Sequence, residues 1–151
     1  MEHSATYDSP LGVIRLTSDG TSLTELRFSD VTHQDARHHS FDNVIRWLDL
    51  YFSGASPDIT FQLAPQGTSF QQRVWRELTT IPYGRTITYG DLAKRIGCRS
   101  AQAVGGAVGR NPIAIIIPCH RVVGTNGALT GYAYGIDLKR RLLDIEKSER
   151  N

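Results

Sequence analysis

Cysteine and long hydrophobic runs are both scarce in this sequence. The 151 residues include two cysteines, Cys98 and Cys119, which are too few for a disulfide framework. No stretch approaches the roughly 20 apolar residues that a membrane-spanning helix needs. The first residues also lack the basic start and apolar run of a signal peptide. We therefore exclude membrane proteins and secreted disulfide scaffolds, and expect a cytoplasmic protein without membrane contact.

Three histidines near one another could suggest a metal site. His33, His38 and His39 lie close together in the sequence. No cysteines or spaced carboxylates accompany them, whereas structural zinc sites usually combine cysteine and histidine ligands. We interpret these histidines as part of a solvated loop and expect no metal site.

Charge is distributed unevenly along the chain, although the formal net charge is only +2. Residues 1–66 contain four basic and nine acidic residues, a net of −5. Residues 67–151 contain thirteen basic and six acidic residues, a net of +7. This asymmetry predicts a polyanionic partner, such as nucleic acid, for the C-terminal part. A chance distribution of solvated charge is the alternative.

The first part of the chain alternates between apolar and polar residues. This pattern at 12–16 and 23–28, around an Asp-Gly turn, predicts a β-hairpin with one buried face. Apolar residues at helical spacing predict a helix over 41–52. A further strand is expected over 59–63. Together these elements predict a small lobe with an antiparallel sheet.

The second part is predicted to be mainly helical. Capping residues and helical spacing predict four helices. The first is capped by Thr68 or Ser69, carries apolar residues from Phe70 to Leu78 and is stopped by 82–84, and the others are at 89–96, 101–109 and 137–147. A tight glycine-containing turn separates the second from the third, which is typical of a helix-turn-helix. We therefore predict an α+β protein with an N-terminal lobe at 1–63, a linker at 64–66 and a DNA-binding lobe at 67–151.

Cys119 is the strongest candidate for a catalytic residue. It follows the apolar segment Ile113–Ile117 and a proline, and precedes His120 and Arg121. Cationic neighbours favour the thiolate, which is the nucleophilic form of cysteine. The alternative is that Cys119 is a small buried hydrophobe, an interpretation that suits Cys98 well.

The segment Ile116–Val123 resembles the active-site motif of the O6-alkylguanine-DNA alkyltransferases. The resemblance is close over 67–147 and looser over 1–63. Further matching motifs occur in the same order and spacing, at 70–75, 81–84, 88–93, 103–107, 109–112, 131–132 and 139–146.

The resemblance implies a fold and a reaction. The fold is a ribonuclease-H-like N-terminal lobe followed by the DNA-binding and alkyl-transfer domain. The reaction is direct repair of double-stranded DNA, in which the alkyl group of O6-alkylguanine, and of O4-methylthymine, moves irreversibly to Cys119. Because water does not readily cleave a thioether, each molecule acts once, as a suicide transferase. No cofactor is needed, and a monomer is expected.

Individual roles also follow from the resemblance. Cys119 is the nucleophile, and His120 takes its proton through a water. Glu146 orients His120, Tyr89 donates a proton to the leaving guanine, and Asn111 supports the active-site loop. The substrate pocket is expected to comprise Val122, Tyr132, Ala133 and Tyr134.

The expected DNA-binding helix, 101–109, contains three glycines, which cost about 2–3 kcal/mol of helix propensity. A face without side chains allows close approach, either to another helix or to DNA. The resemblance implies minor-groove binding with base flipping. The expected DNA contacts are Gln102, Ala103, Gly105, Gly106, Arg99, Arg110 and Arg121.

Two residues depart from the family pattern. Gln102 stands where the family commonly has an intercalating arginine, so weaker support for the flipped state is expected. Tyr134 stands where many members have glycine, and its ring is expected to restrict bulky alkyl groups.

Three other kinds of protein remain as alternatives. A Cys-His hydrolase would use the same thiolate and turn over many times. A helix-turn-helix protein without enzymatic activity would use Cys119 only structurally. A sensor that binds lesions without transferring the alkyl group is disfavoured by the presence of Cys119.

Overall fold

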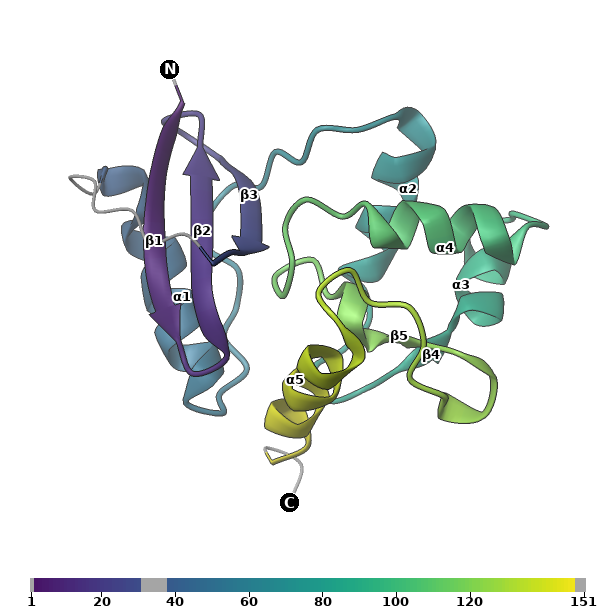
Figure 1. The fold of residues 1–151 in the computed structure, drawn as a ribbon. Coiled ribbons are helices and arrows are strands. Elements are labelled where there is room, and N and C mark those ends of the chain that lie inside the picture. The colour runs from purple at the N-terminus through teal and green to yellow at the C-terminus, as the bar shows by residue number, and fades with distance from the viewer. Residues whose placement is uncertain (1, 31–37, 149–151) are drawn as a thin grey trace.

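The N-terminal lobe is built on a three-stranded antiparallel sheet with β2 in the centre (Figure 1). The computed structural model describes residues 2–30 and 38–148. The strands, in chain order, are β1 (His3–Ser9), β2 (Gly12–Ser18) and β3 (Leu23–Phe28). The predicted hairpin is confirmed as β2 and β3. Its core-facing residues Ile14, Leu16 and Leu26 have no exposed surface.

Strand β1 is not predicted from the sequence. Ala5 is its only buried residue, and it lies opposite Leu16 of β2. An edge strand with so few buried residues shows no clear alternation of apolar and polar residues. Its conformation depends instead on backbone pairing with β2.

Helix α1 (Asp42–Phe52) follows the 3-10 turn η1 (His39–Phe41) and lies behind the sheet in Figure 1. The predicted helix over 41–52 is therefore confirmed. Its apolar residues recur at helical spacing and enter the core. The buried members are Val44, Trp47, Leu48 and Tyr51.

The strand predicted over 59–63 is wrong. Of this segment only Leu63 makes a β-bridge, to Leu23, and Ile59 is exposed. Backbone hydrogen bonds join Leu23 to Gln62 and Ala64. The pairing therefore involves only the end of the predicted strand, and Pro65 prevents it from extending further along the chain because proline has no N–H to donate.

The C-terminal lobe is mainly helical, as predicted. Its helices are α2 (Ser69–Leu78), α3 (Tyr89–Arg95), α4 (Ala101–Gly109) and α5 (Ile136–Ser148). Two parallel short strands, β4 (Ile87–Thr88) and β5 (Val122–Val123), and two 3-10 turns, η2 (Cys119–Arg121) and η3 (Thr125–Gly127), complete it. The α+β fold class is thus confirmed.

Side-chain caps explain where three of these helices begin. The hydroxyls of Thr68, Thr88 and Ser100 each accept a hydrogen bond from the backbone N–H three residues later, at 3.0–3.1 Å. Between α3 and α4 the chain turns at Gly97, whose φ of +69° suits glycine. The helix-turn-helix follows from these local features.

The two lobes meet at the segment that precedes Cys119. Leu26 of β3 donates its N–H to Pro112 O at 2.9 Å and accepts from Ala114 N at 3.0 Å. The N-terminal sheet thereby holds the start of the apolar segment in place. Within the described residues, no helix has the length and apolar character needed to cross a membrane.

Candidate active site and DNA-binding surface

Cys119 stands at the end of a buried and tightly folded segment. Ile113–Ile117 is buried, as its composition predicts, but it forms turns and a single β-bridge. Ile115 has a φ of +70°, a left-handed conformation that costs a β-branched residue about 1–3 kcal/mol. Strain of this kind persists only where the surroundings fix the backbone, so the position of Cys119 is closely determined.

Asn111 supplies much of that constraint. Its Nδ2 donates to the carbonyls of Ile113 at 3.2 Å and Ile117 at 2.8 Å, and its Oδ1 accepts from the Ile113 N–H at 3.0 Å. The side chain spans the apolar segment from its first residue to its last. Asn111 therefore lies where a residue supporting the cysteine turn was expected.

Cys119 is 7% exposed, and burial raises the pKa of its thiol. A hydrogen bond from Asn111, the charge of Lys139 and two backbone N–H groups oppose that rise. The net effect is a protonated thiol at neutral pH. A nucleophilic reaction at this sulfur needs a base.

His120 is suited to be that base. Its ring is fully buried, and Nε2 lies 2.5 Å from Glu146 Oε2. Burial alone would raise the pKa of Glu146, but hydrogen bonds from His120 and Arg121, with the charge of Arg121 and of the protonated form of His120, lower it to about 2. An ionised carboxylate only accepts hydrogen bonds, so the imidazole proton resides on Nε2.

The other ring nitrogen of His120 is available. Nδ1 is buried and has no hydrogen-bond partner among the described residues. Burial lowers the pKa of His120, Arg121 and Lys139 act in the same direction, and Glu146 opposes them. The imidazole is therefore neutral near pH 7, with a lone pair on Nδ1 that can accept a proton.

Arg121 lies inside this cluster and not on the surface where a contact with DNA was expected. Its Nε donates to Glu146 Oε1 at 2.8 Å and its Nη1 donates to Ile81 O at 2.7 Å. The residue is only 9% exposed. A buried carboxylate without a cation would be costly, which explains why the guanidinium points inward.

Tyr51 is a member of the cluster that sequence reasoning missed. Its hydroxyl donates to Glu146 Oε2 at 2.7 Å, from a helix 95 positions earlier in the chain. In the sequence, Tyr51 is one more apolar position of the predicted helix 41–52. Nothing in that pattern indicates a long-range polar contact.

Lys139 was also missed. It has no exposed surface, and its Nζ donates to Val122 O at 2.6 Å and Thr130 O at 2.9 Å. The ammonium group lies 5.8 Å from the centre of the Tyr89 ring. Burial lowers its pKa, and the Cys119 thiolate would oppose that effect. Lysine is rarely fully buried without partners, and these two carbonyls supply them.

An open hollow of about 600 Å³ lies between α4 and the loop at 130–133. The Tyr89 hydroxyl donates to Gly131 O at 3.2 Å on one wall. The Tyr132 hydroxyl is buried without a hydrogen-bond partner among the described residues, and burial raises its pKa, as would a charge on Cys119. The lining residues are Tyr89, Ala101, Gln102, Gly105, Gly109, Thr130, Gly131, Tyr132 and Ala133.

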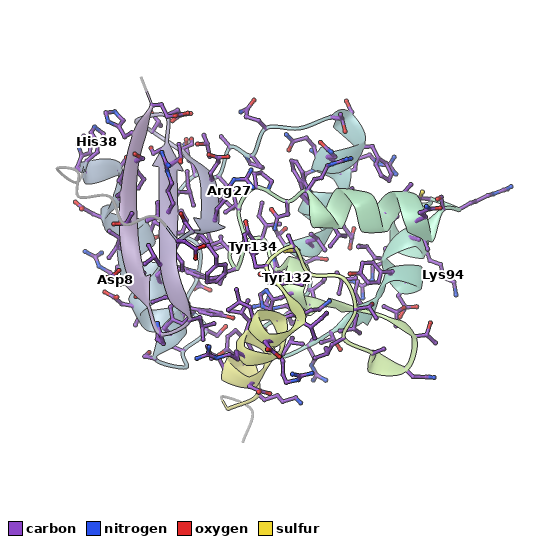
Figure 2. The ribbon with its side chains drawn as sticks, in the orientation of Figure 1. Asp8, Arg27, His38, Lys94, Tyr132 and Tyr134 are labelled. Atoms are coloured by element: carbon purple, nitrogen blue, oxygen red, sulfur yellow. The ribbon has the colours of Figure 1, made fainter. Side chains whose placement is uncertain are left out.

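The four expected pocket residues occupy different positions. Tyr132 and Ala133 line the hollow, whereas Val122 is fully buried. Tyr134 lies between the lobes, beside Arg27 and Tyr132 in Figure 2. Its ring is 5.3 Å from Phe28 of β3 and 5.7 Å from Tyr132. Tyr134 thus packs against Tyr132, which lines the hollow, and is not itself among the lining residues.

The expected DNA-binding residues, except Arg121, gather at α4. Gln102, Ala103 and Gly106 are exposed along the helix, and Gly105 is half-buried against the Tyr89 ring. Arg99 and Arg110 are exposed just outside the two helix ends. The result is a helix face with little side-chain bulk between two cations.

The histidines of the N-terminal lobe do not form a metal centre in the part of the chain that is described. The His38 ring stacks on His3 at 3.7 Å and lies tilted against His39 at 4.1 Å, while His33 lies outside the described residues. No group of three or more potential metal ligands occurs within residues 2–30 and 38–148.

Comparison with known families covers both lobes. Residues 3–65 match the ribonuclease-like domain of 6-O-methylguanine DNA methyltransferase, and residues 69–148 match its DNA-binding domain. A methylated-DNA–protein-cysteine methyltransferase of Mycobacterium tuberculosis is 48% identical, over 98% of this chain and 94% of that protein. A protein of the same name from Methanosarcina acetivorans is 45% identical, over 95% and 97%.

Solved structures agree with this assignment. The crystal structure of the M. tuberculosis O6-methylguanine methyltransferase has a TM-score of 0.89 at 46% identity, covering 99% of this chain and 94% of that one. The same M. tuberculosis protein crystallised with DNA has a TM-score of 0.88 at 47% identity, with coverage of 97% and 94%. The chain described here belongs to the 6-O-methylguanine DNA methyltransferase family.

Proposed function

We propose that this protein repairs alkylated DNA by moving the alkyl group of O6-alkylguanine irreversibly to Cys119. The second proposed substrate is O4-methylthymine in double-stranded DNA. The observation that carries it is the buried series of Cys119, His120 and Glu146 within a chain that matches the family over nearly its whole length. The series provides a nucleophile, a base and a group that orients the base.

The reaction begins with proton transfer. His120 Nδ1 accepts the thiol proton through a water, and the resulting imidazolium is stabilised by Glu146. The Cys119 thiolate attacks the alkyl carbon, a C–S bond forms, and the bond between that carbon and O6 breaks. The electron pair stays on the guanine, which receives a proton from Tyr89. The product thioether is not hydrolysed, so each molecule reacts once, without a cofactor.

DNA is bound through α4 in the minor groove. Arg99 and Arg110 contact phosphates on either side, a contact with little sequence dependence. The damaged base leaves the stack and enters the hollow bounded by Tyr132 and Ala133. Gln102 fills the gap left in the duplex, and Gly105 and Gly106 permit close approach of the helix.

The proposed protein has two domains and acts as a monomer. The N-terminal lobe comprises residues 1–63, residues 64–66 are a linker, and residues 67–151 form the DNA-binding and transfer domain. The protein acts as a monomer in the cytoplasm. Its partner is double-stranded DNA that contains the lesion.

Mass spectrometry of the protein after incubation with duplex containing O6-methylguanine tests the function. One methyl group is expected on the peptide that contains Cys119, with repaired DNA never exceeding the amount of protein. Repeated turnover would instead identify a hydrolase. Binding without a mass change would identify a sensor or a regulator.

A further inference from the structure

The hydrogen bonds around Glu146 extend into the N-terminal lobe. Three donors meet at Glu146 Oε2: His120 Nε2 at 2.5 Å, the Tyr51 hydroxyl from α1 at 2.7 Å and Arg121 Nη2 at 3.2 Å. Tyr51 has no exposed surface, and its ring stacks on Trp47 at 5.2 Å. A residue of the non-catalytic lobe therefore shares one carboxylate oxygen with the base of the proposed reaction.

We propose that Tyr51 is a positioning residue for alkyl transfer, which sets the protonation state of His120 by sharing Glu146 Oε2 with it. The inference rests on the function proposed above, because it concerns the same base. Tyr51 takes up part of the negative charge of Glu146. His120 is thereby kept neutral, with Nδ1 free to accept the thiol proton.

Electrostatics give the direction of the effect. Fewer donors to Oε2 leave more negative charge facing His120, which favours the protonated imidazole. Burial and the charge of Glu146 raise the pKa of Tyr51, so its hydroxyl keeps its proton and remains a donor through the neutral range. Several charged or titratable groups face this pair and are unchanged when the hydroxyl is removed. They are Glu146 and Lys139 on α5, Arg121 and Cys119 on η2, and Tyr83 beside the Tyr51 ring.

The variant Tyr51→Phe removes the hydroxyl and keeps the ring that packs on Trp47. A matched control is available in the same lobe, since Tyr7 also donates its hydroxyl to a carboxylate, Asp49 Oδ1, at 2.7 Å. Tyr7→Phe removes a tyrosine–carboxylate hydrogen bond between β1 and α1. It leaves the hydrogen bonds of Glu146 intact.

Two measurements are made on the full chain. NMR of the protein labelled at the histidine ring gives the pKa of His120, and the methyl-transfer rate is recorded against pH with an O6-methylguanine duplex. Tyr51→Phe should raise the pKa of His120 by about one unit, the usual scale for a lost hydrogen bond to a charged partner. The acidic limb of the rate profile should move upward by the same amount. Neither quantity should move in Tyr7→Phe.

The outcomes separate the two proposals. A wild-type protein that transfers no methyl group defeats the proposed function, whereas the titration of His120 still tests its coupling to Tyr51. An unchanged His120 pKa, with a rate lowered equally at every pH, would reduce Tyr51 to a packing residue and overturn the inference. If Tyr51→Phe does not fold, the Cζ chemical shift of Tyr51 in the wild-type protein decides. It should follow the titration of His120, and a shift that stays constant through that titration overturns the coupling.

Discussion

Replacing Glu146 by glutamine removes a buried charge and keeps the shape of the side chain. The pKa of Glu146 is lowered from its ordinary 4.5 to about 2. At about 1.4 kcal/mol per unit, this corresponds to roughly 3 kcal/mol of stabilisation of the folded protein. Leaving the Arg121 guanidinium without its anion gives a similar figure, about 3–5 kcal/mol. We therefore expect Glu146→Gln to lower the free energy of unfolding by about 3 kcal/mol at pH 7.

The dependence on pH provides a second check. Because the pKa of Glu146 is depressed in the folded state, its contribution is complete above pH 4.5 and is lost as the pH falls toward about 2. The variant has no such group to protonate. The stability gap between wild type and variant should therefore close between pH 4.5 and 2.

Urea unfolding at a series of pH values measures this gap. Asp137→Asn is the control, since Asp137 pairs with Arg140 at 3.2 Å on an exposed surface and should contribute nothing measurable. A gap at pH 7 no larger than that of the control would refute the account of the buried cluster. A gap of constant size down to pH 3 would show that the glutamine amide, and not the lost charge, is responsible.

Glu146→Gln should also slow methyl transfer. If the amide NH₂ faces His120, it donates to Nε2 and moves the imidazole proton to Nδ1, which removes the lone pair that accepts the thiol proton. Loss of an orienting carboxylate next to a catalytic histidine typically costs about 100-fold or more. A single-turnover assay with an O6-methylguanine duplex, on folded variant, measures the effect.

Three further substitutions test the remaining parts of the site. Cys119→Ala should gain no methyl group by mass spectrometry. Its DNA binding, measured by fluorescence anisotropy, should stay largely unchanged. Lost binding would instead indicate that the turn at residue 119 has unfolded. Gln102→Arg should tighten binding and speed repair at low salt. It should also steepen the dependence of log affinity on log salt by about one, as expected for one added phosphate contact. Unchanged or slower repair would show that Gln102 is already well placed. Tyr134→Gly should raise the rate of benzyl transfer relative to methyl transfer about tenfold, which is the scale of a small change in pocket size. Tyr134→Phe should leave this ratio unchanged. An equal ratio in both variants would contradict a steric role for the ring.

Local chemistry explains why much of the fold is predictable. The hydroxyls of Thr68, Thr88 and Ser100 cap helices that begin where the sequence places them. Gly97 permits the turn between α3 and α4. These features depend on residues within three or four positions of one another. By contrast, β1 has a single buried residue, and the pairing of the 59–63 segment stops at Pro65, so neither outcome follows from alternation of apolar residues.

The candidate site also contains residues that local motifs identify and residues whose partners lie far away in the chain. Cys119, His120 and Glu146 were identified through motifs, and Asn111 lies close to Cys119 in the chain. The inward orientation of Arg121 could not be foreseen, because it depends on a carboxylate 25 positions away. Tyr51 and Lys139 were missed for a related reason. Each has a partner that the fold alone brings near, and each resembles an ordinary helix residue in the sequence.

The polar cluster and the cysteine turn together explain why the two lobes form one functional unit. Every residue that would touch the substrate lies in the C-terminal lobe, yet two of the constraints on those residues come from the other lobe. Leu26 supplies both backbone hydrogen bonds that fix the segment entering the turn at Pro112 and Ala114. Tyr51 supplies one of the donors to Glu146. Without these contacts, buried backbone groups at 112–114 would lack partners, and the carboxylate would act on His120 with a different strength. In the proposed reaction, the N-terminal lobe therefore acts through hydrogen bonds to residues of the C-terminal lobe.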